Sequence, residues 1–305
     1  MFKNLIIYRV GPTWAAHGDA LQDALAKSPF LPCAPSQAVS AGWAPPRGLP
    51  HAPLLESVDG QWLMTFAVEQ RIVPASVVKQ RLAERAALIE KETGRKPGKK
   101  LAKELKEEVL LELLPRAFTK QSALKVWLNP KDRLLMIDAS SPAKADDVVT
   151  HLVKAADGLV LTPLNTVQSP AMAMAQWLTT GEAPFGFSVD RECELKSADD
   201  TRSAVRYARH PLDIEEIRQH IAQGKVPTQL ALTWQGRVGL LLTEAMQVKK
   251  VTFLEGVFEG AKPARDEAFD ADAALATGEL RRLVPDLIEA LGGEQALGVP
   301  ALAAA

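Results

Sequence analysis

The side chains that most often carry metal or nucleophilic chemistry are few in this sequence. None of the five histidines falls in an HExxH motif or another pair with metal-ligand spacing. The two cysteines, Cys33 and Cys193, form no CxxC pair, which predicts buried, reduced thiols and neither a zinc site nor a disulfide framework. We therefore expect no metal and no cofactor.

The stretch "GRKPGKK" is close to a phosphate-binding loop but does not fit one. Gly94 and Gly98 are one residue too close for GxxxxGK[ST], and the stretch joins two expected helices instead of following a strand. No GxSxG or GxGxxG motif is present. The acidic pairs Asp146-Asp147 and Asp199-Asp200 are typical of a helix start and of a turn. We expect no catalytic residues and a protein that is not an enzyme.

The chemistry that the sequence does favour is binding of phosphate by cations. The net charge of −1 hides an uneven distribution. Residues 79–125 hold 13 Lys or Arg against 7 Asp or Glu, whereas the chain from residue 255 onward holds 4 against 10. The simplest interpretation of such a run is a solvated helical surface with ion pairs such as Lys100–Glu104.

Three observations favour a nucleic-acid backbone as the ligand instead. Five cations crowd one turn without matching acids, more follow where the chain re-enters the core, and others lie at the ends of later elements. No recognition helix or RNP-like aromatic motif is evident, so we expect no base reading. The candidate DNA-binding residues are Lys79, Arg81, Arg95, Lys96, Lys99, Lys100, Lys103, Arg116, Phe118, Lys120, Lys125, Arg206, Arg209, Lys225 and Arg237.

The stretch "LLPRAFTKQS", residues 113–122, places Phe118 between Arg116 and Lys120 just after Pro115 must stop a helix. Two interpretations stay open. The ring either packs under the base of the preceding helices, or lies exposed between the cations and meets a DNA base.

Two helices joined by a short Gly/Pro turn must position most of these cations. Periodicity predicts helices over residues 76–93, with Ser76 as N-cap, and 99–114. The second carries an apolar stripe at i+4 spacing that exceeds what one partner helix needs, so we expect it to contact a second copy of the chain. The predicted dimer contacts are Leu101, Leu105, Val109 and Leu113.

The remaining pattern predicts an α+β fold. Hairpins are expected with turns at Asp59-Gly60, at residues 129–132, near Asp199-Asp200 and at Gln235-Gly236. "GWAPPRGLPHAP" is expected to be a loop, and a helix is expected near residues 279–291. Both halves of the chain follow the order strand, helix, hairpin, proline, helix, hairpin, which predicts pseudo-repeated antiparallel sheets with a projecting helical hairpin.

This pattern sets the expected domain bounds. The core would begin with residues 1–75, the projecting tip would be 76–120, the rest of the core with the second repeat 121–255, and an acidic segment with one helix and a loose tail 256–305. No apolar run approaches the roughly 20 residues of a membrane helix, and the N-terminus leads directly into a strand. We therefore expect a cytoplasmic protein with no membrane partner.

Several stretches resemble the RdgC family of recombination-associated proteins, in the same order along the chain. They are "FKNLIIYRV" (2–10), "GWAPP" (42–46), "VVKQRL" (77–82), "LLPRAF" (113–118), "GKVPTQLALTWQGR" (224–237), "FDADAALATGEL" (269–280) and "LIEALGGE" (287–294). The tip "EKETGRKPGKKLAKE" and the tail "GVPALAAA" depart from the family pattern.

The resemblance implies a non-enzymatic DNA-binding protein of the bacterial nucleoid. It implies a ring-shaped homodimer whose basic hole encircles duplex DNA, with the helical tip contacting its twin. It also implies binding of double- and single-stranded DNA with little sequence preference, and restraint of the RecA recombinase. The alternative is a protein–protein adaptor whose basic tip docks on an acidic partner.

Overall fold

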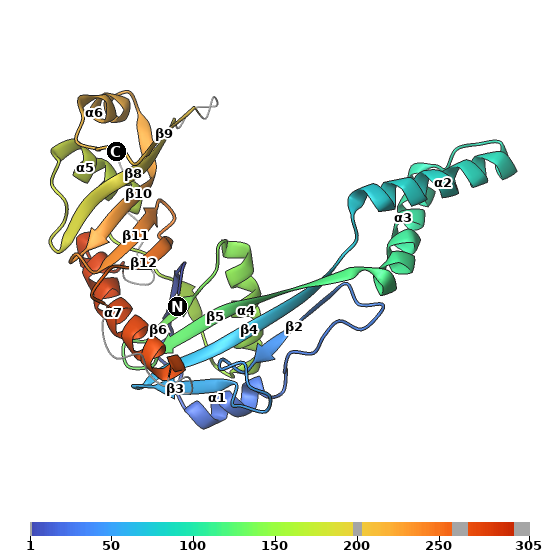
Figure 1. Ribbon diagram of the computed structural model, residues 1–305, viewed down its shortest axis with the longest axis horizontal. Coiled ribbons are helices and arrows are strands. Elements are labelled where there is room, and N and C mark those ends of the chain that lie inside the picture. The colour runs from blue at the N-terminus through green and yellow to red at the C-terminus, as the bar shows by residue number, and fades with distance from the viewer. Residues whose placement is uncertain (1, 198–202, 258–267, 296–305) are drawn as a thin grey trace. The chain divides into compact units, whose positions relative to one another are not determined.

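A computed structural model describes residues 2–197, 203–257 and 268–295 of the chain (Figure 1). It confirms the predicted α+β class, with two antiparallel sheets and seven α-helices among the described residues. None of the helices in these ranges is both long and apolar enough to span a membrane.

The larger sheet has seven strands in the order β2-β4-β5-β6-β1-β7, with β3 paired to β4. Their bounds are β1 Ile6–Val10, β2 Val39–Ala44, β3 Leu55–Val58, β4 Gln61–Ile72, β5 Phe118–Asn129, β6 Leu134–Ile137 and β7 Leu161–Pro163. The second sheet has the order β12-β11-β10-β8-β9. Its strands are β8 Phe187–Ser197, β9 Ala204–Ala208, β10 Lys225–Trp234, β11 Val238–Thr243 and β12 Val248–Phe253.

The helices occupy the segments between and after these strands. They are α1 Gly18–Leu25, α2 Ala75–Thr93, α3 Lys99–Leu113, α4 Pro142–Ala155, α5 Pro170–Thr180, α6 Glu215–Ala222 and α7 Ala268–Ala290, with a short 3-10 turn, η1, over Leu114–Arg116.

The chain divides into two compact units, and β4 and β5 each contribute to both. The first unit takes in residues up to Leu21, Leu55–Met64 and the chain from Lys125 onward. The second takes in Gln22–Leu54 and Thr65–Leu124. This division does not test the predicted pseudo-repeat or the four predicted segments, which stay predictions.

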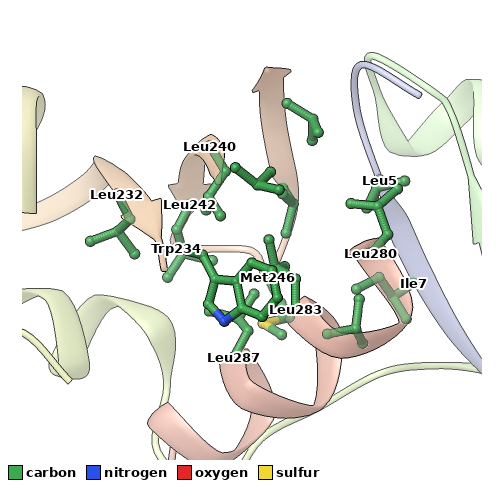
Figure 2. Close-up of a cluster of buried hydrophobic side chains, with 14 of the residues drawn as sticks. Leu5, Ile7, Leu232, Trp234, Leu240, Leu242, Met246, Leu280, Leu283 and Leu287 are labelled. Atoms are coloured by element: carbon green, nitrogen blue, oxygen red, sulfur yellow. The ribbon is translucent and has the colours of Figure 1, made fainter. Parts of the chain in front are cut away.

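In the first unit, α7 supplies apolar side chains to the core of the five-stranded sheet. Leu280, Leu283 and Leu287 of α7 lie with Trp234 of β10 in one buried cluster (Figure 2). The Trp234 ring is fully buried, and its Nε1 donates a hydrogen bond to Asp286 at 2.8 Å. This bond satisfies the one polar atom of the indole, which burial would otherwise penalise.

Two of the predicted hairpin turns have the backbone conformation that their sequences favour. Asp59 and Gly60 both have positive φ (48° and 75°), as do Gln235 and Gly236 (46° and 64°). These pairs match the left-handed two-residue turns that suit the twist of antiparallel strands. The turn over 129–132 also joins β5 to β6, whereas the turn near Asp199-Asp200 lies outside the described residues.

Three local predictions were wrong. The expected loop "GWAPPRGLPHAP" begins inside β2, where Trp43 is buried and packs edge-on against Phe66 at 5.2 Å between ring centroids. Helix α2 begins at Ala75 with Pro74 at its N-cap, so Ser76 is not the cap. Helix α7 begins at Ala268, 11 residues before the expected start.

The second unit contains the helices α2 and α3. Helix α2 ends at Gly94, whose φ of 71° is the left-handed conformation that glycine adopts at low cost. Leu105 and Val109 of α3 are buried. Arg85 of α2 joins the helices through ion pairs with Glu108 and Glu112.

The hydrogen bond between two buried side chains in the larger sheet generates a stability prediction. Trp127 is fully buried, and its Nε1 donates to Gln61 Oε1 at 2.8 Å. Trp127→Phe removes the donor, leaves the buried Gln61 oxygen unpaired and opens a cavity, so it should cost about 2–4 kcal/mol of unfolding free energy. Urea denaturation measures this loss. Trp62→Phe, at a partly exposed position of β4, is the control, and an equal loss in the two variants would contradict the assignment.

Candidate nucleic-acid interface

The predicted DNA-binding residues fall into one group in the second unit and another in the first. The first group surrounds the α2–α3 turn and the corner after α3, and comprises Lys79, Arg81, Arg95, Lys96, Lys99, Lys100, Lys103, Arg116, Phe118 and Lys120. The second comprises Lys125, Arg206, Arg209, Lys225 and Arg237.

The α2–α3 turn concentrates positive charge. Arg95, Lys96, Lys99, Lys100 and Lys103 are all exposed, and the first turn of α3 contains no acid. The N-terminus of a helix already carries a partial positive charge, so lysines there add to an unfavourable potential that a bound anion would relieve. Within the described ranges, none of these five cations forms a salt bridge.

Three acids of the two helices, Glu84, Glu108 and Glu112, form ion pairs away from the turn. Arg81 pairs with Glu84 at 3.1 Å, and Arg85 takes Glu108 and Glu112. The anticipated Lys100–Glu104 pair is absent from the salt bridges of the described chain. Lys79 is exposed on α2. None of these ion pairs involves a cation at the turn.

A single arginine fixes the corner that follows α3. Arg71 of β4 donates from Nη1 to the carbonyl oxygens of Leu114 and Ala117, at 3.1 and 3.3 Å. Its Nη2 and Nε reach the carbonyl oxygens of Cys33 and Ala34, each at 3.2 Å. Because the guanidinium is planar and always charged, it can satisfy several carbonyls at once. Arg71 thereby ties the corner and a neighbouring loop to β4.

Phe118 leaves this corner as the first residue of β5, with 87% of its surface exposed. The interpretation that its ring packs under the base of the helices is therefore wrong for this chain. Arg116 and Lys120 on either side are also exposed, and neither forms a salt bridge within the described residues. The corner presents an aromatic ring flanked by two available cations.

Two of the predicted cations of the first unit, Arg237 and Arg206, are held by buried carboxylates. Arg237 makes a two-pronged contact with Glu279 of α7, at 2.9 and 2.6 Å, and these hydrogen bonds raise the pKa of Arg237 and lower that of Glu279. Arg282 contacts the same carboxylate. The sequence gave no indication of the Arg237–Glu279 ion pair, because the two residues are 42 positions apart in the chain.

Arg206 is held in a similar way by Glu194. Burial alone would raise the pKa of Glu194, but hydrogen bonds from Lys196, Thr228 and Arg206 outweigh it and lower the pKa to about 2. Thr228 donates to this carboxylate at 2.8 Å. Lys225 Nζ lies 3.0 Å from His220 Nδ1. Arg206, Lys225 and Arg237 thus all have structural partners. Arg209 and Lys125 are exposed.

The predicted dimer residues have unequal access to a partner. Leu105 and Val109 are buried within the chain. Leu101 is 40% exposed, and Leu113 is half-buried. Sequence reasoning also missed Arg71 and Glu69 of β4, because nothing in a strand sequence shows that a side chain will bind main-chain groups of other segments. Arg71 donates to carbonyl oxygens, and Glu69 accepts from the Cys33 N–H at 2.8 Å.

Comparison with known proteins assigns the chain to a family. The profile described as "Putative exonuclease, RdgC" matches residues 1–294. The chain is 47% identical over 299 residues to the "Recombination-associated protein RdgC" of Dechloromonas aromatica (strain RCB), covering 96% of this chain and 98% of that protein. It is 44% identical over 298 residues to the protein of that name from Herminiimonas arsenicoxydans, covering 97% and 99%. The chain therefore belongs to the RdgC family.

Proposed function

We propose that this protein binds DNA through the phosphate backbone with little sequence preference, and that it modulates homologous recombination in the bacterial nucleoid by restraining the RecA recombinase. The observation that carries the proposal is the set of exposed, unbridged cations around the α2–α3 turn and the Phe118 corner. The relatives named recombination-associated support the cellular role.

The charge pattern suits a polyanion better than a single acidic group. The unbridged cations are spread over the turn and over the corner, and each is on a flexible or exposed side chain. Such cations neutralise successive phosphates and release counterions, which gives affinity without reading sequence. The exposed Phe118 ring adds a surface on which an unstacked base, or an apolar group of a recombinase, can pack.

We further propose that two copies close into a ring that encircles duplex DNA. The exposed side chain of Leu101, on the apolar stripe of α3, supports a contact between the α2–α3 hairpins of two copies. A closed ring would explain how modest, sequence-blind contacts hold a protein on DNA. The adaptor alternative, in which the tip docks on an acidic protein, predicts the same tip charges but no salt-dependent affinity for unrelated duplexes.

The family description names an exonuclease, and our proposal assigns binding without cleavage. Across the described residues, no group of three or more His, Cys, Asp or Glu is arranged to hold a metal ion. Incubation of end-labelled DNA with the protein and divalent cations tests the point directly. Progressive shortening of the label-bearing strand would overturn the non-enzymatic assignment.

The first prediction concerns the salt dependence of binding to unrelated duplexes. The logarithm of affinity should fall linearly with the logarithm of salt concentration, with a slope of about 0.9 per phosphate contacted. Arg116→Ala and Lys120→Ala should each reduce that slope by about one. Fluorescence anisotropy over a series of salt concentrations measures this slope.

The control is Arg218→Ala, which removes an equal charge that is already paired with Asp213 at 2.5 Å. It should leave the slope unchanged. Strong preference for one short sequence would refute the proposal.

The second prediction concerns Phe118→Ala. Because the ring is 87% exposed, the substitution should change the unfolding free energy by less than about 0.5 kcal/mol, while weakening DNA binding or RecA inhibition. Thermal melting and strand-exchange assays give the two readouts. Phe185→Ala is the matched control, since Phe185 is 100% exposed in the first unit. If Phe118→Ala unfolds the protein, the corner is a structural element only.

The third prediction concerns assembly. Light scattering at micromolar concentration should give twice the chain mass of 33.0 kDa. Leu101→Glu should weaken the hairpin contact because it places a charge on the apolar stripe. If the unmodified protein has the mass of one chain at that concentration, the ring proposal is wrong. The proposed binding to the DNA backbone would then still be tested by the salt dependence of affinity.

A further inference from the structure

A groove lies between α2 and the start of α3, beside the turn that joins them. Its volume is about 480 Å³, within the roughly 300–1,000 Å³ that is typical of ligand-binding clefts. All of its lining residues belong to the second unit. They are Leu82, Ala83, Ala86, Ala87, Glu90, Lys96, Pro97, Ala102 and Leu105.

Small apolar side chains make up most of the groove surface. Ala83, Ala86 and Ala87 lie on one face of α2, because residues three and four positions apart on a helix are neighbours. Ala83, Ala87 and Ala102 are exposed, and Leu105 is buried. A methyl group leaves room above it that a longer side chain would fill. The groove is therefore an accessible apolar surface, and such surfaces on soluble proteins mark interaction sites.

Lysines border this apolar surface on both helices. Lys99 lies three positions before Ala102 and Lys106 lies four positions after it, so both share the groove side of α3. Lys79 lies four positions before Ala83 and shares the groove side of α2. All three lysines are exposed, and none forms a salt bridge within the described residues.

The lining itself adds one cation and one acid. Lys96 lies at the turn and is exposed. Within residues 65–124, which the structure describes throughout, Glu90 is the one acid that lines the groove. The border of the groove therefore carries more positive than negative charge, and it is complementary to an acidic ligand.

This charge separates the possible occupants of the groove. A two-fold contact between copies would bring the same groove of each chain together, and it would place lysine borders of like charge against each other. Leu101, which supports the proposed contact between copies, is not among the lining residues. A DNA backbone would bind the lysines but has no large apolar group to cover the alanines. An acidic helix with one apolar face satisfies both parts of the groove.

We propose that the groove binds an amphipathic helix of a partner protein, with large apolar side chains on the alanines and acidic side chains beside the lysines. Helices that lay an apolar face into a groove are a common mode of peptide recognition. The inference goes beyond the proposed function, because it adds a protein ligand to a DNA-binding chain. It also differs from the adaptor alternative, because the apolar groove selects the partner and DNA binding is retained.

Two neighbouring substitutions on α2 distinguish the groove from the rest of the helix. Ala87→Gln places a longer side chain in the groove without changing the charge, and glutamine is a good helix former. Leu88→Gln is the matched control, since Leu88 is 60% exposed and does not line the groove.

The probe is a fluorescein-labelled peptide of about 20 residues, which is long enough to form a helix. It has leucines at i, i+3, i+4 and i+7 and glutamates on its other faces, and a second peptide has the same composition in scrambled order. Fluorescence anisotropy with the full chain measures the affinity. We expect the ordered peptide to bind about tenfold more tightly than the scrambled one, Ala87→Gln to remove about tenfold of that affinity, and Leu88→Gln to change it little.

Other results would overturn the inference. Equal affinity for the two peptides would mean that charge alone attracts them. Binding that responds to Leu88→Gln and ignores Ala87→Gln would place the peptide outside the groove, and no binding of the ordered peptide at low salt would leave the groove without this ligand. A lower solution mass of Ala87→Gln than of the unmodified chain would identify the groove as a contact between copies. If Ala87→Gln lowers the melting temperature, Ala83→Gln at another exposed groove position repeats the test.

Discussion

The corner between α3 and β5 depends on the side chain of Arg71. A helix that ends abruptly leaves its last carbonyls without partners, and Pro115 prevents the chain from continuing the helix to satisfy them. Arg71 adds a donor to the carbonyl oxygen of Leu114, which also accepts from the Ala117 N–H at 3.1 Å, and it donates to the carbonyl oxygen of Ala117. Its remaining N–H groups bind the loop at Cys33 and Ala34. This one guanidinium therefore holds both ends of η1, directly before Phe118, against β4.

The two units treat their cations in opposite ways. In the first unit, buried carboxylates take up arginines: Glu279 holds Arg237 and Arg282, and Glu194 holds Arg206. A buried carboxylate without such partners would be strongly destabilising, so these arginines are part of the fold. In the second unit, the ion-paired acids of α2 and α3 lie on the helix surfaces, and the cations of the turn and the corner form no salt bridge in the described residues. A count of charges along the sequence cannot separate these two situations, because it does not show which acids are buried.

Local patterns were sufficient for much of the fold. The pairs Asp59-Gly60 and Gln235-Gly236 have the turn conformation that their residue types favour, and the helical periodicity of residues 99–113 is realised as α3. Interpretations failed where tertiary packing outweighs local preference. Gly42 and Trp43 precede two prolines, and this sequence resembles a loop, yet both residues lie in β2. A Cβ at Gly42 would lie 2.7 Å from the Phe30 nitrogen, so glycine allows the segment at Phe30 to pack on β2. Leu105 and Val109 are buried within the chain, and the dimer contact predicted for them stays a prediction.

The lysines at the start of α3 have a consequence for how the hairpin responds to its surroundings. Lys99 and Lys100 repel each other and oppose the helix dipole, so the first turn of α3 is under electrostatic strain whenever no anion is near. Dissolved salt screens that repulsion and would steady the turn, although the same screening weakens attraction to phosphates. Higher ionic strength should therefore stabilise the first turn of α3 and, at the same time, weaken the affinity of the tip for a polyanion. If the tip binds a polyanion as proposed, it would be least ordered at the low ionic strength that favours this binding, and a bound phosphate would offset the positive charge at the start of α3.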